Sequence, residues 1–416
     1  MTNISVEKHT GPVGSILSLL LSMSFVIAAN GLLYTVIALR VTANDASLSY
    51  SGLVIAAFAA GLMLGALKGS WFIERVGHIR SYAAFCALST IFTLLLGVFE
   101  SKEIWFLLRA ASGFCLGGSF LVIESWLSEQ TPDKRRGAIF AIYITVCQLA
   151  LAGGQALLHF VDLSTNQPFV LAGALYALGL VPIALTLTPQ PAPPEQRRRS
   201  LLRIIRLAPV AVLGALISGI TLGSLLGLGP AYAASTGLSE DQISTLMAAC
   251  IAGGIALQWP IGRLSDRIDR RIVIELVALA TLFASLFMLN TNAESMYIAT
   301  LTWAVFGAFA FVIYPLSLAH GQDLARPEDV VTTSGTIVFC YGVGAAIGPA
   351  AGALVMDLAG PNAFPIWLGT SNGVLVIISI IRLMVRRRLP INQAVEFSPV
   401  ALPQVAPASD MNPRGD

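Results

Sequence analysis

The sequence predicts an all-α polytopic membrane protein, with twelve transmembrane helices arranged as two pseudo-symmetric six-helix bundles. The prediction rests on long apolar runs, on the one-sided placement of Lys and Arg, and on a weak internal repeat. Of the 416 residues, 56% are hydrophobic and only 12% are charged, whereas soluble domains average about 45–50% apolar and about 25% charged residues. This composition is typical of a chain that crosses a bilayer many times.

Twelve apolar runs are long enough to cross the hydrocarbon core, which takes about 20 residues of helix. The expected spans are residues 14–39, 50–70, 80–99, 104–126, 137–160, 168–188, 207–233, 242–262, 272–290, 295–319, 331–356 and 362–385. The first run is too long for the apolar region of a cleavable signal, so we interpret it as a membrane span.

The Lys and Arg residues orient the spans. The chain has 25 of them, and they gather in the two tails and in the loops after the even-numbered spans. Only Arg40 and Lys102 fall in loops on the other side, and Arg109 lies within a span. Because cytoplasmic loops collect positive charge, we expect a multi-pass protein of the inner membrane with both termini in the cytoplasm.

The chain divides into two halves of nearly equal length. We expect a cytoplasmic tail at 1–13, one bundle at 14–188, a cytoplasmic loop at 189–206, a second bundle at 207–388 and a disordered tail at 389–416. The central loop begins "PQPAPPEQRRR", in which prolines disfavour helix and arginines stay in water.

The halves are weakly repeated, as is common in transporters. Glu74-Arg75 and Asp266-Arg267 follow the second and eighth spans, which are corresponding places. A second match lies at a constant separation of 190 residues, which we call the repeat offset. It pairs Gly117 with Gly307, Val122-Ile123 with Val312-Ile313, and Gly154 with Gly344.

These features resemble the major facilitator superfamily over about residues 14–388. The loop after span eight, "IGRLSDRIDRR", matches the pattern G-x-L-x-D-R-x-x-R-R, with Asp269 where the family has a later Gly. The copy after span two is looser, since Ser70 replaces the first Gly and Glu74 replaces Asp, while Gly77 is kept. The stretches "ESW" (124–126) and "GPAAGALVMDLAGP" (348–361) resemble the YcaD-type branch.

The resemblance implies a conformational role for these two loops. A charged pair between neighbouring helices would stabilise one access state and break in the other, and we call it the latch. Its expected residues are Glu74, Arg75, Gly77, Gly262, Asp266, Arg267, Arg270 and Arg271. The alternative is that these cations only set the topology.

Span four carries a fixed charge. Arg109, Gly113 and Gly117 share one helix face and resemble the superfamily pattern R-x-x-x-G-x-x-x-G. Exposure of an arginine to lipid costs at least about 2.5 kcal/mol. We therefore expect Arg109 to face a cavity, where it binds an anionic substrate group or acts on a nearby proton site. The alternative is that it snorkels to the periplasmic surface.

Glu124 lies on the same span as Arg109, nearer its other end, at a separation of about 22 Å along a helix axis. This separation is too large for an ion pair with Arg109. We expect Glu124 to be the carboxylate that Arg75 contacts in the latch. The alternative is a carboxyl group that carries protons.

Other polar residues are candidates to line the cavity. Spans one, four, seven and ten line it in the superfamily, which implies Asn30, Tyr34, Thr221, Ser224, Trp303 and Tyr314. Polar groups in spans five and eleven should also avoid lipid, and these are Gln148, Gln155 and Tyr341. For each of them the alternative is a role in helix packing.

The function expected from these features is secondary active transport of a small neutral or anionic organic solute, coupled to protons. Glu124 is the one acid well inside a span, whereas a cation exporter needs a membrane carboxylate that faces its cavity. Multidrug or cation efflux by drug/proton antiport is the alternative, although span five lacks the G-x-x-x-G-P pattern of such antiporters. A non-transporting membrane sensor or enzyme is the remote alternative.

Several partner and cofactor classes are not expected. No GxxxxGK[ST] loop is present to bind ATP, and a net charge of +2 gives no reason to expect nucleic acid. The five cysteines fall in apolar runs without metal-binding spacing. We expect a monomer with no cofactor and no metal, whose partners are a small substrate, protons and the lipid bilayer.

Overall fold

The computed structural model describes residues 12–43, 48–99, 101–131, 133–186, 201–291, 295–325 and 330–385. All regular secondary structure within these ranges is helical, and twelve helical segments are long and apolar enough to cross a membrane. The predicted fold class is therefore confirmed. Most of the expected N-tail and central loop and all of the expected tail 389–416 lie outside the described residues.

The first half contains six spanning helices. They are α1 (Pro12–Ala43), α2 (Leu48–Val76), α3 (His78–Val98), α4 (Lys102–Gln130), α5 (Asp133–Ala156), which a 3₁₀ turn η1 (Leu157–Phe160) extends, and α6 (Gln167–Ala184). The second half begins with a short helix, α7 (Leu201–Leu207), at the end of the segment that we expected to be a loop.

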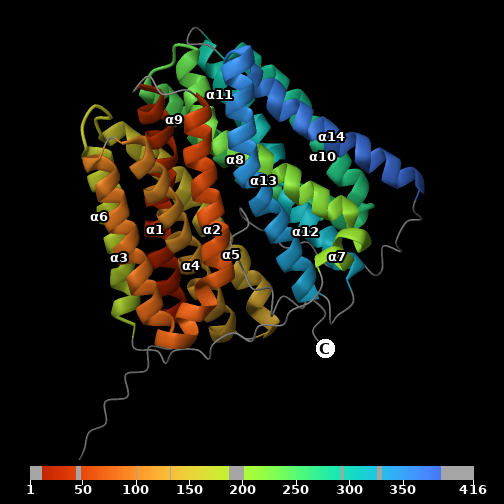
Figure 1. Ribbon diagram of the computed structural model, residues 1–416. Coiled ribbons are helices and arrows are strands. Elements are labelled where there is room, and N and C mark those ends of the chain that lie inside the picture. Colours follow the sequence, from red (N-terminus) through yellow and green to blue (C-terminus); the bar gives the residue numbers. More distant parts are fainter. Residues whose placement is uncertain are drawn as a thin grey trace, which may run out of the picture.

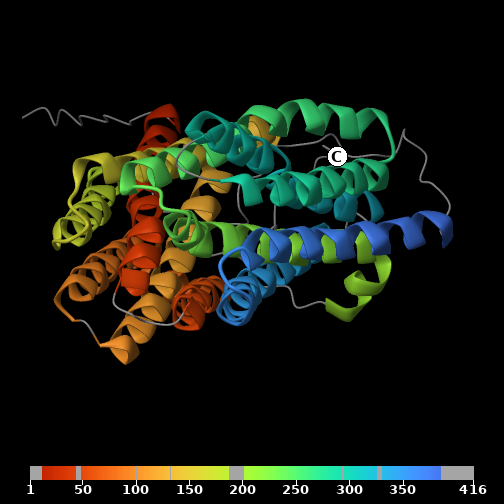
Figure 2. The same ribbon diagram turned by 90° about the horizontal axis from the view of Figure 1, so that it is seen from above.

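The spanning helices of the second half are α8 to α14. They are α8 (Pro209–Ser235), α9 (Glu240–Arg267), α10 (Arg270–Phe287), followed by η2 (Met288–Asn290), α11 (Met296–Ala310), α12 (Ile313–Leu324), α13 (Val330–Ala359) and α14 (Ala363–Val385). Figures 1 and 2 show the red to yellow helices of the first half gathered beside the green to blue helices of the second.

The tenth span is broken into two helices. A turn at Phe311 and Val312 separates α11 from α12, and the span continues to Leu324, beyond the end at 319 that we expected. The break places Tyr314 in the first turn of α12, and the extension brings Asp323 into the helix.

Glycines bring helix backbones into close contact within each half. A methyl group added at Gly117 would overlap a carbonyl oxygen of α2, and one added at Gly307 would overlap a carbonyl oxygen of α9. The same holds for Gly154 against α1 and for Gly344 against α8. The glycines that pair at the repeat offset therefore occupy equivalent packing positions in the two halves.

The two halves meet along α2 with α13 and along α5 with α9. The backbone N–H of Ser49 donates to Asp357 (2.8 Å), and the His159 ring lies 2.7 Å from a carboxylate oxygen of Asp241. With twelve spans, α1 begins and α14 ends on one side, which we call the terminal side. Both contacts lie on the opposite, far side, and Figure 1 shows α2 and α13 adjacent there and diverging toward the terminal side.

Candidate functional site: charged and aromatic residues between the two halves

Arg109 is buried in the first half. It lies in the second turn of α4, where Gly113 on the same face lets the backbones of α4 and α2 touch at Phe58. This contact brings the Arg109 guanidinium carbon 3.9 Å from the centroid of the Phe58 ring. The Arg109 side chain is 1% exposed, so it is enclosed by protein and does not extend to the surface.

The guanidinium of Arg109 is incompletely paired. Its Nε and Nη1 atoms are buried and have no hydrogen-bond partner. Among the described residues, the ionisable groups close enough to act on it electrostatically are the hydroxyls of Tyr34 and Tyr176, and neither is a carboxylate. A buried arginine in this state lacks the counter-charge that such groups require.

Aromatic rings extend from Arg109 toward the second half. Tyr34 on α1 is half-buried and makes an edge contact with Phe58, with ring centroids 5.8 Å apart. Tyr341 on α13 is close enough to Tyr34 to interact with it electrostatically, and it makes an edge contact with Tyr314 on α12 at 5.3 Å. The structure thus brings three of the predicted site residues, Tyr34, Tyr314 and Tyr341, into one line across the two halves.

Glu124 lies at the other end of this line. Its side chain is 4% exposed, and one carboxylate oxygen accepts a hydrogen bond from the Tyr143 hydroxyl at 3.3 Å. The other oxygen is buried without a partner. Tyr314 lies within electrostatic range of Glu124. The acid therefore faces α5 and the second half.

The structure does not bring Arg75 and Glu124 together. The Arg75 guanidinium lies over the ring of Trp71, 5.3 Å from its centroid, and both Glu74 and Arg75 are exposed. Gly77 ends this loop with a positive φ of 83°, a conformation that favours glycine. The next residue, His78, is buried and lies 3.0 Å from the Ser125 hydroxyl of α4.

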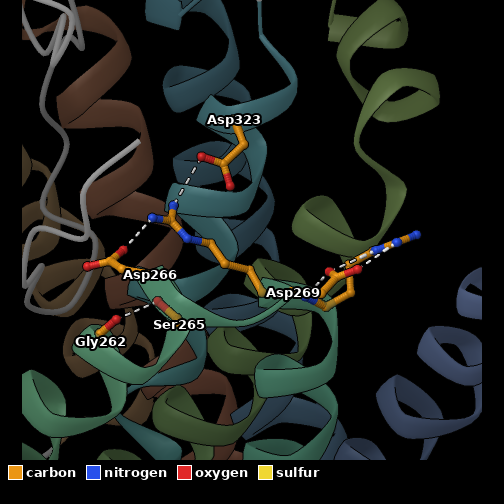
Figure 3. Close-up of polar contacts among 7 residues, drawn as sticks. Gly262, Ser265, Asp266, Asp269 and Asp323 are labelled. Carbon is orange, nitrogen blue, oxygen red and sulfur yellow. Dashed lines mark hydrogen bonds and ion pairs between the residues drawn. The ribbon is translucent and has the colours of Figure 1, made fainter. Parts of the chain in front are cut away.

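The loop after α9 forms an ion-pair cluster, drawn in Figure 3. The Arg270 guanidinium is 2.7 Å from a carboxylate oxygen of Asp266 on α9 and 3.2 Å from one of Asp323 at the end of α12. Arg270 therefore makes a charged contact between neighbouring helices, whereas Arg267 is exposed, and the latch role stays a prediction. Gly262 accepts a hydrogen bond through its carbonyl from Ser265.

Asp269, which stands where the family has a later Gly, has a structural role here. It has a φ of −55°, caps the start of α10 by accepting from the Arg271 N–H, and pairs with the Arg271 guanidinium at 2.8 Å. Burial alone would raise the pKa of Asp269, but the hydrogen bonds and charge of Arg271 outweigh burial and lower the pKa. A capping carboxylate thus replaces the left-handed glycine of the first half.

The other predicted site residues have different surroundings. The side-chain oxygen of Gln155 accepts a hydrogen bond from the Thr35 hydroxyl at 2.5 Å. Its backbone carbonyl accepts one from the Ser244 hydroxyl of the other half. The Trp303 ring nitrogen donates to Thr291. Thr221 and Ser224 accept from residues of α14, Asn372 and Trp367. These are packing or interface contacts, and none of them is made with Arg109.

Asn30 and Gln148 are buried, and each has one side-chain amide atom without a partner. Four residues of the site were not predicted: Phe58, Tyr143, Tyr176 and Asp323. For Asp323 one available signal was the repeat offset, which pairs it with another acid, Asp133.

Comparison with known proteins identifies the family. The model of the Major Facilitator Superfamily matches residues 19–349 and 211–404. The chain belongs to this superfamily. A curated relative from Escherichia fergusonii, "Uncharacterized MFS-type transporter YcaD", is 28% identical over 84% of this chain and 90% of its own length. A relative of the same name from Shigella flexneri is 28% identical over 85% of this chain and 91% of its own. These matches support the predicted placement as an MFS transporter of the YcaD type.

Solved structures share the fold. The nucleoside transporter NupG superposes with a TM-score of 0.75 at 12% identity, covering 89% of this chain and 99% of its own. A bacterial homologue of the human lysosomal transporter Spinster, in an inward-facing and unoccupied conformation, superposes with a TM-score of 0.71 at 15% identity, over 89% and 95% of the two chains. The chain is therefore a multi-pass transporter of the MFS fold.

Proposed function

We propose that this transporter moves an organic anion across the inner membrane by alternating access, and that proton movement drives it. The observation that carries the proposal is Arg109, which is buried with two unpaired nitrogens and without a carboxylate among its described electrostatic neighbours. Arginine keeps its charge in proteins. A transported anion would supply the missing counter-charge, so of the neutral and anionic solutes expected from the sequence we favour the anionic ones.

Glu124 is proposed as the proton carrier. A carboxylate held by a single hydrogen bond of 3.3 Å, with its second oxygen buried and unpaired, is costly to keep ionised. Protonation would remove that cost, and release of the proton would require access to water. Between the two roles considered for this residue, the geometry favours proton transfer over contact with Arg75.

The conformation described here supports the alternating-access part of the proposal. The contacts of Ser49 with Asp357 and of His159 with Asp241 join the halves on the far side. Placing Lys- and Arg-rich loops in the cytoplasm makes the terminal side cytoplasmic. The state would then be closed to the periplasm, with both termini in the cytoplasm and a single chain as the transporting unit.

The test is uptake into proteoliposomes with an imposed pH gradient, over a panel of organic anions, sugars and cationic dyes. We expect gradient-driven uptake of at least one anion and none in empty liposomes. Arg109→Gln should reduce its uptake by about 30-fold or more, since an unpaired buried charge partner costs about 2–5 kcal/mol. Arg206→Gln removes an exposed cation of α7 and should leave uptake unchanged.

Two uptake results would contradict the proposed function. If Arg109→Gln leaves the uptake of every accepted anion unchanged, Arg109 is not the anion-binding residue. Uptake of cationic dyes alone, with dependence on Glu124, would instead support the drug/proton antiport reading, because Glu124 would then serve as the cation partner.

A further inference from the structure

The surroundings of Arg109 indicate the class of its anion, and this inference rests on the proposed function. The Phe58 ring covers one face of the guanidinium at 3.9 Å. An approaching carboxylate must therefore bind at the guanidinium edge, where donors point, and not at that face. The body of the anion then lies beside whatever borders that edge.

The residues that border this region are aromatic. Tyr34 and Tyr176 are the electrostatic neighbours of Arg109, and Tyr34 contacts Phe58 edge to face. Tyr34 is half-buried although it lies deep in α1, and it neighbours Tyr341 of the other half. Tyr34 therefore lies near the boundary between the two halves.

The second half presents further rings to the same region. Tyr341 is 8% exposed and meets Tyr314 edge to face at 5.3 Å. Among the described residues, no hydrogen bond is made by the hydroxyls of Tyr34, Tyr314 and Tyr341. Aromatic rings from both halves thus lie near one another beside Arg109, with hydroxyls available for a polar substituent.

Aromatic rings favour aromatic partners over aliphatic ones of equal size. Edge-to-face and offset contacts add about 0.5–1.5 kcal/mol per ring pair beyond the area buried. We propose that the transported anion is an aromatic carboxylate, with its carboxylate on Arg109 and its ring packed among Phe58, Tyr34 and Tyr341. Because Tyr341 belongs to the second half, ring binding would join the two halves around the substrate.

The experiment compares acids that differ only in aromaticity. Binding of benzoate and cyclohexanecarboxylate, and of 3-phenylpropanoate and 3-cyclohexylpropanoate, is measured by calorimetry on the full-length detergent-solubilised protein. Within each pair we expect the aromatic acid to bind about 3- to 10-fold more tightly. Tyr341→Leu should reduce that ratio toward one, and Tyr341→Phe should retain it.

Controls separate the possible failures. Tyr297→Leu replaces a tyrosine of α11 that is 81% exposed, and it should leave the ratio unchanged. Equal binding within both pairs, or an unchanged ratio in Tyr341→Leu, would overturn this inference. If Arg109→Gln still weakened the binding of these acids, the proposed function would stand. Binding of none of the four acids, or binding that Arg109→Gln does not weaken, would overturn this inference, and the uptake panel would then decide whether another anion is carried.

Discussion

The two halves share a helix arrangement but differ in the chemistry inside it. At the repeat offset that aligns their contact glycines, Arg109 corresponds to Ala299 and Glu124 to Tyr314. The first half thus holds Arg109 and Glu124, and the second half places tyrosine rings near them. In the loops the charged residues lie in the other half: the second half has the Arg270 ion-pair cluster, whereas the first half has His78 in contact with the Ser125 hydroxyl.

This difference separates what the fold needs from what transport needs. Backbone contacts through glycine recur in both halves because helix packing requires them. Among the described residues, the buried charges Arg109 and Glu124, which lack a counter-charge, both lie in the first half, where the proposed substrate and proton would compensate them. We infer that the first half recognises charge, while the second half encloses the substrate and is held together at its terminal side by ion pairs.

The largest expected effects come from the shared packing glycines. Gly117→Val and Gly307→Val each force a side chain into a backbone carbonyl, and backbone cannot move aside, so each should cost at least about 3 kcal/mol. We expect both variants to lose the monodisperse peak in size-exclusion chromatography. Gly153→Ala is the control, since open space surrounds Gly153. If one of the two valine variants folded well and the other did not, the two glycines would not be equivalent.

A second comparison should distinguish the two loops. Arg270→Gln removes the Arg270 cation from Asp323, which is 7% exposed, and loss of one partner of a buried pair costs about 3–5 kcal/mol. His78→Gln perturbs a neutral hydrogen bond worth about 0.5–1.5 kcal/mol. Thermal unfolding should rank the variants in that order. The reverse order would place the stabilising loop in the first half.

The smallest effect concerns the capping residue. Asp269→Gly restores the family glycine and removes the ion pair with Arg271; replacement of a helix cap by glycine costs only roughly a few tenths of a kcal/mol. Because the pKa of Asp269 is lowered in the folded state, its contribution is complete above its ordinary pKa, about 4, and disappears as pH falls below it. The melting-temperature difference between wild type and variant should therefore be largest at neutral pH and shrink below about pH 4. A melting-temperature difference that grew as the pH fell would contradict the lowered pKa of Asp269.

Sequence reasoning predicted the spans, the repeat and the burial of Arg109, since apolar length and a lone cation in a span leave few alternatives. It did not predict the surroundings of Glu124, because helix spacing gives depth in the membrane but not which neighbouring helix a side chain faces. Asp323 was missed because the tenth span extends beyond its apolar run. Phe58 gave no signal, since an apolar residue in an apolar run is unremarkable until the helix across from it is known.

The central claim is that Arg109 and Glu124 have separate roles, anion binding and proton transfer. Counterflow exchange and gradient-driven uptake of the same labelled anion in proteoliposomes test it directly. Arg109→Gln should abolish both, whereas Glu124→Gln should retain exchange and lose the response to the pH gradient, with Glu275→Gln on α10 as the control carboxylate. Equal loss of both activities in the two variants, or gradient-driven uptake that survives in Glu124→Gln, would contradict the account.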